Sequence, residues 1–439
     1  MSPALDAARS GEYRRSHIHQ SMKKGIAMTQ RTTCAVVGGG PAGMVLGLLL
    51  ARAGVDVTVL EKHGDFLRDF RGDTVHPSTL QLLDELGLGD CFAELPHSEL
   101  HEIAFPFPDG SRVVVGDLSR LKVAHPYIAM VPQWDLLNLL AEAGAHEPAY
   151  TLRMRAEVTE LIRESGSVRG VRYRTEDGEL HELRADLTVA AGGRWSIARA
   201  QAELRPKELP VPIDAWWFRL PRKPDDPAAL TPVASNRRFV LVIPREGFLQ
   251  LAYLARKGID TQLRERGVEW FRQEVAAAVP WLADRVGELA SMDDVKHLDV
   301  RLNRLNRWHV DGLLCIGDAA HAMSPIGGVG INLAVQDAVA AATLLAEPLR
   351  RGDVRSDVLA KVRRRRLAPT IAVQTLQRIL HRAVVEPIID GERQGPPKPL
   401  VALLKAVPAA SFVPAYLVGV GLRPEHAPVF ARRTAVRSR

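Results

Sequence analysis

Residues Thr33–Glu61 have the sequence TCAVVGGGPAGMVLGLLLARAGVDVTVLE, and this stretch decides the fold. The apolar run Cys34–Val37 predicts a buried strand, which a glycine-rich turn follows. The segment Pro41–Ala53 is long and apolar enough for a helix, and Val55–Leu60 predicts a second buried strand. A strand, a helix and a second strand joined this closely form a βαβ unit. We therefore expect an α/β fold with a parallel sheet.

Three glycines in the turn have the spacing G-x-G-x-x-G. Gly38 permits the tight turn, Gly40 lets the backbone approach a pyrophosphate at the helix N-terminus, and Gly43 allows close packing of helix on strand. Glu61 ends the second strand about 20 residues later, where a carboxylate can accept hydrogen bonds from ribose hydroxyl groups. The pattern therefore predicts a Rossmann-like site for FAD or NAD rather than NADP. The residues expected at this site are Gly38, Gly40, Pro41, Ala42, Gly43, Glu61 and Lys62.

The composition is that of a globular protein with about two or three domains. The 439 residues are 46% hydrophobic and 25% charged, and the formal net charge is +7. The positive charge is carried by residues 1–30 and 431–439, which we expect to be a disordered basic extension and a basic tail. Because the remaining chain is close to neutral, we expect no nucleic-acid-binding face.

Membrane and metal signals are weak. No apolar run reaches the roughly 18 residues that a membrane span needs, so no stable membrane insertion is expected. The cysteines are far apart and have no C-x-x-C spacing. Cys34 and Cys315 lie in apolar runs and are expected to be buried. The sequence favours a cytoplasmic protein without a metal site and does not indicate its oligomeric state.

Outside the dinucleotide-binding unit, the hydrophobic pattern changes to short segments of alternating apolar and polar residues, which predict strands. Residues 99–131 and 205–305 predict an antiparallel sheet, and we assign them to a substrate domain. The cofactor domain is then discontinuous and consists of residues 31–98, 132–204 and 306–350.

The aromatic residues of the range 205–305 have two interpretations. Trp216 and Phe218 share one face of a predicted strand, where they either line a pocket for an aromatic substrate or belong to the core. The segment Asp260–Val279 then predicts one helix.

Residues 351–430 predict a helical C-terminal region. A basic-faced helix is expected over Asp353–Arg382, with the run Arg363–Arg366 in solvent. The apolar segment Leu400–Val420 is expected to cap the fold, with a substrate-entrance or membrane-touching role as the alternative.

A second motif, GDAAHAMSPIGGVGIN, occupies Gly317–Asn332. Asp318 follows a predicted strand, where its carboxylate can hold a ribityl hydroxyl group. The glycines of Gly327–Gly330 let the backbone lie against a flat ring. A helix that begins near Ile331 points its positive end at that ring, which stabilises negative charge on a reduced flavin. His321 is expected to be structural and to hydrogen-bond the loop.

With these motifs in this order, residues 31–430 resemble the single-component FAD-dependent aromatic hydroxylases, the family typified by p-hydroxybenzoate hydroxylase. The resemblance implies an FAD-dependent monooxygenase that hydroxylates an aromatic, quinone-like or polyketide-like small molecule with O2 through a flavin C4a-hydroperoxide. NADPH or NADH is the transient co-substrate. No catalytic side chain is implied, only backbone near the flavin at Pro325, Gly328 and Gly330. The cofactor contacts that the resemblance implies are Glu61, Arg71, Gln133, Asp318, Pro325, Gly328, Gly330, Ile331 and Asn332.

The chain departs from the family at its middle motif. The usual Asp-Gly-x-x-Ser is Gly192-Gly-Arg-Trp-Ser196 here. Because the family's aspartate is associated with FAD and pyridine-nucleotide handling, Gly192 brings efficient reduction by NAD(P)H into question. Two alternatives follow, an FAD-dependent dehydrogenase or reductase without oxygen insertion, and a non-catalytic flavin-binding protein. An NAD-only dehydrogenase is disfavoured, because it does not need Gly317–Asn332.

Overall fold

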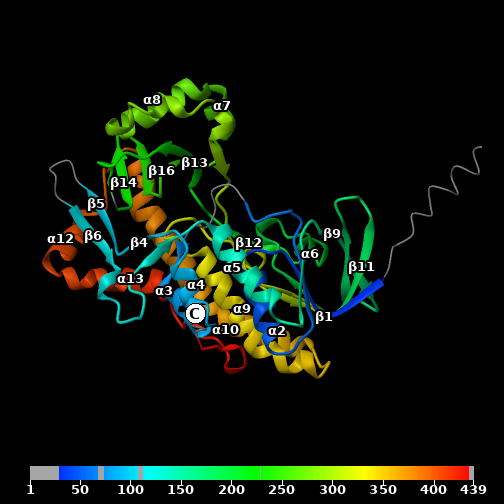
Figure 1. Ribbon diagram of the computed structural model, residues 1–439. Helices are drawn as coiled ribbons and strands as arrows, with labels where there is room; N and C mark the ends of the chain where they lie inside the picture. The colour runs from blue at the N-terminus through cyan, green and yellow to red at the C-terminus, as the bar shows by residue number, and fades with distance from the viewer. Residues whose placement is uncertain (1–28, 68–73, 107–111, 228, 435–439) are drawn as a thin grey trace, which may run out of the picture.

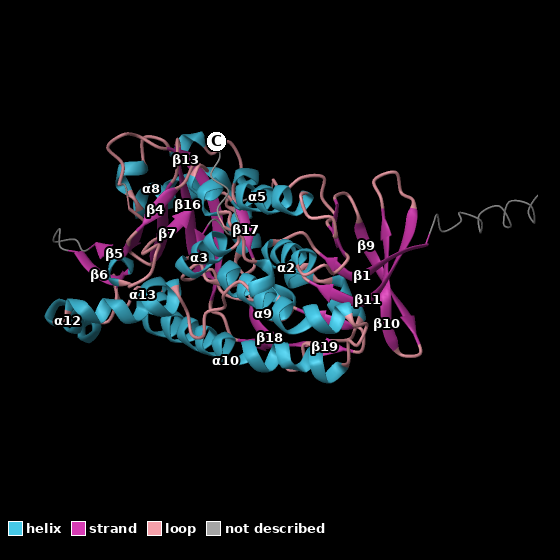
Figure 2. Ribbon diagram, turned by 60° about the horizontal axis from the view of Figure 1, so that its bottom comes forward, coloured by secondary structure: helices cyan, strands magenta, loops and turns pink. Residues whose placement is uncertain are grey.

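The computed structural model describes residues 29–67, 74–106, 112–227 and 229–434 (Figure 1). They form a large mixed sheet with helices packed on it, a second, antiparallel sheet, and a helical C-terminal region. In Figures 1 and 2 the strands β9 (Glu157–Glu164) and β11 (Leu180–Ala190) lie at one end of the molecule, and the helix α12 (Lys398–Ala406) lies at the opposite end.

The large sheet contains eight strands. They are β1 (Thr29–Val37), β2 (Val57–Leu60), β8 (Tyr150–Arg153), β9, β10 (Ser167–Arg174), β11, β19 (His309–Val310) and β20 (Leu313–Cys315). The main path runs β19-β20-β11-β1-β2-β8, and the hairpin β9-β10 pairs with β11. The strands from β20 to β8 along this path are parallel, whereas β19, β9 and β10 run antiparallel to their neighbours.

The centre of this sheet is the predicted βαβ unit. β1 and β2 pair in parallel, with Cys34 opposite Val57. Between them, α2 (Pro41–Arg52) is almost entirely buried and packs against α5 (Gln133–Ala145) and α9 (Gly330–Arg350). The predicted α/β fold with a parallel sheet is therefore confirmed. β1 begins earlier than its apolar run, at Thr29, because β11 extends far enough to pair with it.

The second sheet is antiparallel throughout and has the strand order β14-β15-β16-β13-β17. Its strands are β13 (Ile213–Pro221), β14 (Thr231–Ser235), β15 (Arg238–Pro244), β16 (Phe248–Arg256) and β17 (Lys296–Leu298). Figure 1 shows α7 (Asp260–Glu265) and α8 (Gly267–Ala278) over this sheet. The prediction of one helix here is wrong, since the chain turns at Gly267, where φ is +78°.

Short ladders connect these units. β3 (Thr74–Val75), β4 (Ser98–Leu100) and β7 (Ile128–Met130) form one, β5 (Glu102–Pro106) and β6 (Arg112–Asp117) another, and β12 (Pro206–Leu209) and β18 (Leu302–Leu305) a third. The helices α3 (Pro77–Glu85), α4 (Gly89–Ala93) and α6 (Ile197–Gln201) lie between strands. All three ladders are antiparallel, which confirms the predicted architecture. The domain boundaries proposed from the sequence stay a prediction.

The C-terminal region is helical, as predicted. After α9 come α10 (Ser356–Leu380), a π-helical turn (His381–Val385), α11 (Glu386–Ile389), α12 and α13 (Phe412–Gly419). Within the described ranges no single helix is long and apolar enough to cross a membrane. Lys398–Ala406 and Pro408–Gly419 reach that length and composition only together, across a bend of 116°. The cytoplasmic location stays a prediction.

Two cysteines lie in the core of the large sheet. Cys34 and Cys315 are both fully buried, as predicted. Burial raises the pKa of each thiol to about 12. Neither thiol is therefore available as a thiolate nucleophile near neutral pH.

Candidate active site

The glycine-rich loop has the geometry of an anion site. Gly38 has a φ of +113°, and a Cβ atom there would lie 2.7 Å from the carbonyl oxygen of Ala191. A Cβ at Gly43 would lie 2.0 Å from the carbonyl oxygen of Gly38, so helix and strand pack too closely for a side chain. At Gly40, by contrast, no atom lies within 4 Å of such a Cβ, and no side chain caps α2. The open space therefore faces uncapped N–H groups, which is what a pyrophosphate needs.

Glu61 is fixed beside this loop. Its side chain is 3% exposed, and Oε2 accepts a hydrogen bond from the Gly39 N–H at 2.9 Å. Oε1 accepts one from the His63 N–H at 3.0 Å. The carboxylate thus stands at the end of β2 next to the phosphate loop, where the fingerprint expects a ribose ligand.

The second motif meets the first. After β20, Gly317 has a φ of +56°, and a Cβ there would lie 3.1 Å from Cβ of Ala334 and 3.3 Å from Cβ of Ala42. Gly317 therefore packs closely between α9 and α2. The next residue, Asp318, keeps its side chain 29% exposed and accepts a hydrogen bond from Nε of Arg194 at 3.1 Å. The two motifs therefore lie next to each other, and the role of Asp318 as a cofactor ligand stays a prediction.

The loop before α9 is held by residues of β3 and the start of α3. The carbonyl oxygen of Gly328 accepts a hydrogen bond from Thr74 Oγ1 at 2.9 Å and lies 3.0 Å from Nε2 of His76. Burial lowers the pKa of His76 to about 4, so its imidazole is neutral. A Cβ at Gly330 would meet no atom within 4 Å. This leaves the N-terminus of α9 open to a flat ring, with the loop backbone fixed beside it.

The remaining predicted cofactor residues have varied surroundings. Pro325 is half-buried in the loop, Ile331 is buried, and Gln133 is the half-buried first residue of α5. Lys62 is exposed, and Arg71 lies outside the described residues. Asn332 is buried, and its Oδ1 accepts hydrogen bonds from Ser78 and Thr79 on α3, at 2.8 and 3.0 Å. Its Oδ1 atom therefore ties α9 to α3.

A buried ionic network supports the second motif, and the sequence did not reveal it. Asp337 is fully buried on α9. Its Oδ2 lies 2.6 Å from Nε2 of His321 and accepts the Gly317 N–H at 3.0 Å, while Oδ1 accepts Nε of Arg366 at 3.2 Å. Burial alone would raise the pKa of Asp337, but His321 and Arg366 together hold that pKa below its usual value. His321 is therefore structural, as predicted, but its side chain contacts Asp337 of α9 rather than the loop.

The prediction of a solvated run at Arg363–Arg366 is wrong for its last member. Arg366 is fully buried and also contacts Glu425, with 3.3 Å between Nη1 and Oε1. A signal for this was present, since Arg366 lies one helical turn from the buried residues Val362 and Thr370.

Comparisons with known proteins agree with this geometry. The family model described as FAD binding domain matches residues 31–376. The chain belongs to this family. It is 37% identical to 6-methylpretetramide 4-monooxygenase from Streptomyces rimosus over 355 residues, which is 77% of this chain and 81% of that protein. It is 28% identical to rifampicin monooxygenase from Streptomyces venezuelae, over 69% of this chain and 61% of that longer protein.

Solved structures share the fold. OxyS anhydrotetracycline hydroxylase from Streptomyces rimosus superposes with a TM-score of 0.71 at 22% identity, covering 90% of this chain and 77% of that one. PqsL from Pseudomonas aeruginosa, described as a probable FAD-dependent monooxygenase, gives a TM-score of 0.68, also at 22% identity, covering 83% of this chain and 98% of that one. The family model and the relative at 37% identity show that the protein is an FAD-dependent monooxygenase, and the resemblance read from its motifs is confirmed.

The aromatic residues of this monooxygenase occupy both faces of β13. Trp216 and Phe218 are fully buried in a core with Phe271 of α8, and Nε1 of Trp216 donates a hydrogen bond to Asp260 at 2.7 Å. Of the two interpretations, the structure shows the core rather than a pocket. Trp217 lies on the opposite face, against the apolar cluster that also contacts Ile326 of the flavin loop. The strand pattern could not reveal which face meets the cofactor domain.

A Cβ atom fits at Gly192 without a clash. Gly192 has a φ of −77°, and the nearest atom to a Cβ there is the carbonyl oxygen of Val37, at 3.5 Å. Packing therefore does not force glycine at this position. The residue also borders the phosphate loop, since a Cβ on Gly38 would lie 2.7 Å from Cα of Gly192.

Within the described part of the chain, no group of three or more His, Cys, Asp or Glu side chains is placed to hold a metal ion.

Proposed function

We propose that this monooxygenase inserts one oxygen atom from O2 into a fused-ring, polyketide-type aromatic substrate, with NAD(P)H as reductant. The family fixes the cofactor and the type of reaction, whereas the substrate class is the proposal. It is supported by the names of relatives, which act on 6-methylpretetramide and rifampicin. A cytoplasmic location is part of the same proposal and fits the absence of disulfides among its cysteines.

One observation carries the substrate proposal. Trp217 is half-buried on the face of β13 that meets the cofactor domain, and it contacts two apolar clusters. Within the described residues, its Nε1 is buried without a hydrogen-bond partner. A flat apolar surface with one unused N–H group suits a planar aromatic molecule that carries a carbonyl or hydroxyl oxygen.

The chain's own residues would hold FAD at two places. Gly40 and the N-terminus of α2 would take the pyrophosphate, with Glu61 at the adenosine ribose and Asp318 at the ribityl chain. The backbone of Gly328 and Gly330 would lie beside the ring system. When bound and reduced, FAD supplies the oxygen-transfer chemistry.

The protein's contribution is position and electrostatics. The positive end of α9 points at the open space over Gly330, where it stabilises negative charge. The apolar clusters next to Ile326 exclude water from the same region. No side chain in this region is required to form a bond with the substrate.

The test is product analysis under 18O2. The purified enzyme, loaded with FAD, is supplied with NADPH or NADH and a panel of fused-ring and single-ring phenols. We expect a product with one 18O atom from fused-ring substrates, and weaker or no turnover of single-ring ones. Nucleotide oxidation that yields only hydrogen peroxide across the panel would overturn the proposal and favour a dehydrogenase or reductase. Bound FAD that neither nucleotide reduces would favour a non-catalytic binder.

A further inference from the structure

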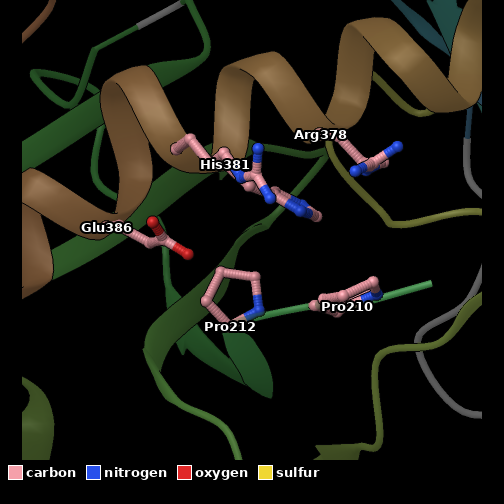
Figure 3. Close-up of a pocket in the computed structure, with 7 residues that line it drawn as sticks. Pro210, Pro212, Arg378, His381 and Glu386 are labelled. Carbon is pink, nitrogen blue, oxygen red and sulfur yellow. The ribbon is translucent and has the colours of Figure 1, made fainter.

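A cavity lies beside the turn that leads into β13. It has a volume of about 170 Å³ and is lined by Pro210, Val211, Pro212, Arg378, His381, Arg382 and Glu386. Figure 3 shows Arg378, His381 and Glu386 on the stretch of helix that faces Pro210 and Pro212. Four of its lining residues are charged or polar, whereas Val211 also packs against the apolar cluster that Trp217 contacts.

The wall is rich in unused hydrogen-bond donors. In the described part of the chain, neither Arg378 nor Arg382 has an ion-pair or hydrogen-bond partner for its guanidinium group. Glu386 would be a natural partner for Arg382 one helical turn away. The π-helical turn His381–Val385 widens that spacing, and no ion pair forms.

His381 adds a buried donor. The side chain is 1% exposed, and Nε2 lies 2.9 Å from Oγ of Ser324. Nδ1 is buried and has no partner among the described residues. When the Ser324 hydroxyl group donates to Nε2, the ring proton is on Nδ1, ready to be donated to a ligand. Burial lowers the pKa of His381 to about 4, which keeps the ring neutral.

The cavity is joined to the flavin loop through this histidine. Ser324 directly precedes Pro325, and Gln377 holds the same loop by donating to the carbonyl oxygens of Ser324 and Ile326, both at 2.8 Å. Val211 packs against the cluster that contains Met323. A ligand in the cavity would therefore lie directly behind the backbone that faces the flavin.

We propose that this cavity binds a phosphate-bearing ribose of the nicotinamide co-substrate. Two guanidinium groups and an imidazole N–H suit the oxygens of a phosphate, and the single carboxylate of Glu386 suits a ribose hydroxyl group. The volume accommodates a group of this size, since one water takes about 30 Å³ of liquid volume. The chain has one G-x-G-x-x-G fingerprint, which FAD uses, so the co-substrate needs another place. This inference rests on the proposed use of NAD(P)H.

Calorimetric titration of the FAD-saturated enzyme tests the inference without any redox step. The probes are 2′-phospho-ADP-ribose and ADP-ribose, which lack the nicotinamide, and inorganic phosphate at the same concentration. We expect at least one nucleotide fragment to bind, and R378A and R382A each to raise its Kd by about tenfold or more. An effect on 2′-phospho-ADP-ribose alone assigns the 2′-phosphate, and an equal effect on both fragments assigns the pyrophosphate.

R364A is the matched control, because Arg364 is an exposed arginine on the same helix outside the cavity. The Kd of the R364A variant for the nucleotide fragments should stay within about twofold of the wild-type value. No binding of either fragment, binding of inorganic phosphate alone, or an unchanged Kd in the double variant R378A/R382A would overturn the inference. If fragments bind as expected and no hydroxylated product forms, the proposed function fails and the cavity assignment stands.

Discussion

At the scale of single residues, two glycines of one motif have opposite surroundings. The space over Gly40 is empty to 4 Å, whereas a Cβ on Gly43 would lie 2.0 Å from a backbone oxygen. We expect G43A to destabilise the fold by about 1–3 kcal/mol through overpacking. We expect G40A to fold normally, with an FAD Kd raised about tenfold, because its methyl group fills the space for the pyrophosphate.

Thermal unfolding of the apoenzyme and fluorescence titration with FAD separate the two effects. A G40A variant that melts early but binds FAD normally would contradict the assigned role of Gly40.

Gly192 permits a gain-of-function test. Because a Cβ there meets nothing closer than 3.5 Å, G192D should fold with the stability of the wild type, within about 0.5 kcal/mol. The family resemblance leads us to expect a rate constant for flavin reduction by NADPH several-fold above that of the wild type. Anaerobic stopped-flow spectroscopy of the flavin band measures it. An unchanged rate constant would mean that flavin reduction by NADPH does not need a carboxylate at residue 192.

At the scale of elements, a buried ion pair between Asp337 and Arg366 joins α9 to α10. Removing one partner of a buried pair leaves the other uncompensated, at a cost of about 3–5 kcal/mol. We expect R366M to lose stability of this order because Asp337 loses a cation, while R364M on the exposed face changes it by no more than about 0.5 kcal/mol. Chemical denaturation of both variants measures the difference. Equal stability of R366M and R364M would show that the network does not hold the helices together.

The same network predicts a pH dependence. The pKa of Asp337 is lower in the folded protein than its ordinary 3.8. Its ionised form therefore stabilises the fold above pH 3.8, and this contribution is lost as the pH falls through the folded-state pKa. The stability advantage of the wild type over D337N should accordingly shrink below about pH 4. An advantage that stays constant down to acid unfolding would exclude this contribution.

The element scale also shows how far the sequence leads. Local patterns predicted β1, α2 and β2, because their apolar periods and glycine positions are contained within the segment. They failed at Gly267, where one left-handed residue divides a helical pattern. They failed again at Arg366. Its charge led to a prediction of solvent exposure, although its helical position placed it on the buried face of α10. Its acidic partners Asp337 and Glu425 are distant in the chain, so only the tertiary fold reveals them.

At the scale of the whole molecule, the site is made where two sheets meet. The large sheet brings Gly40 and Asp318 to one region, and the second sheet presents one face to the loop before α9. Strand alternation predicted that Trp216 and Phe218 share one face, which puts Trp217 on the other. It could not say which face meets the cofactor domain, because that depends on the helices α7 and α8 covering the other side.

This arrangement yields a prediction from two adjacent residues. W216F removes a buried hydrogen bond to Asp260 and leaves space in the core, so we expect a loss of about 1–3 kcal/mol in stability. W217F keeps an aromatic ring in place but removes the unused N–H group, so we expect nearly unchanged stability. In that variant KM for a fused-ring substrate should rise by about tenfold, because a buried hydrogen bond to the substrate is lost.

Steady-state kinetics with the substrate identified by 18O incorporation, combined with thermal unfolding, distinguishes the two faces. The rate of anaerobic flavin reduction serves as the internal control, since neither tryptophan lies among the residues assigned to FAD or to the nucleotide. If W217F changes stability rather than KM, and W216F changes KM, then the substrate lies under α8 and the faces of β13 have been assigned in reverse. The expected result would instead place the ring that is hydroxylated between Trp217 and the backbone of the flavin loop.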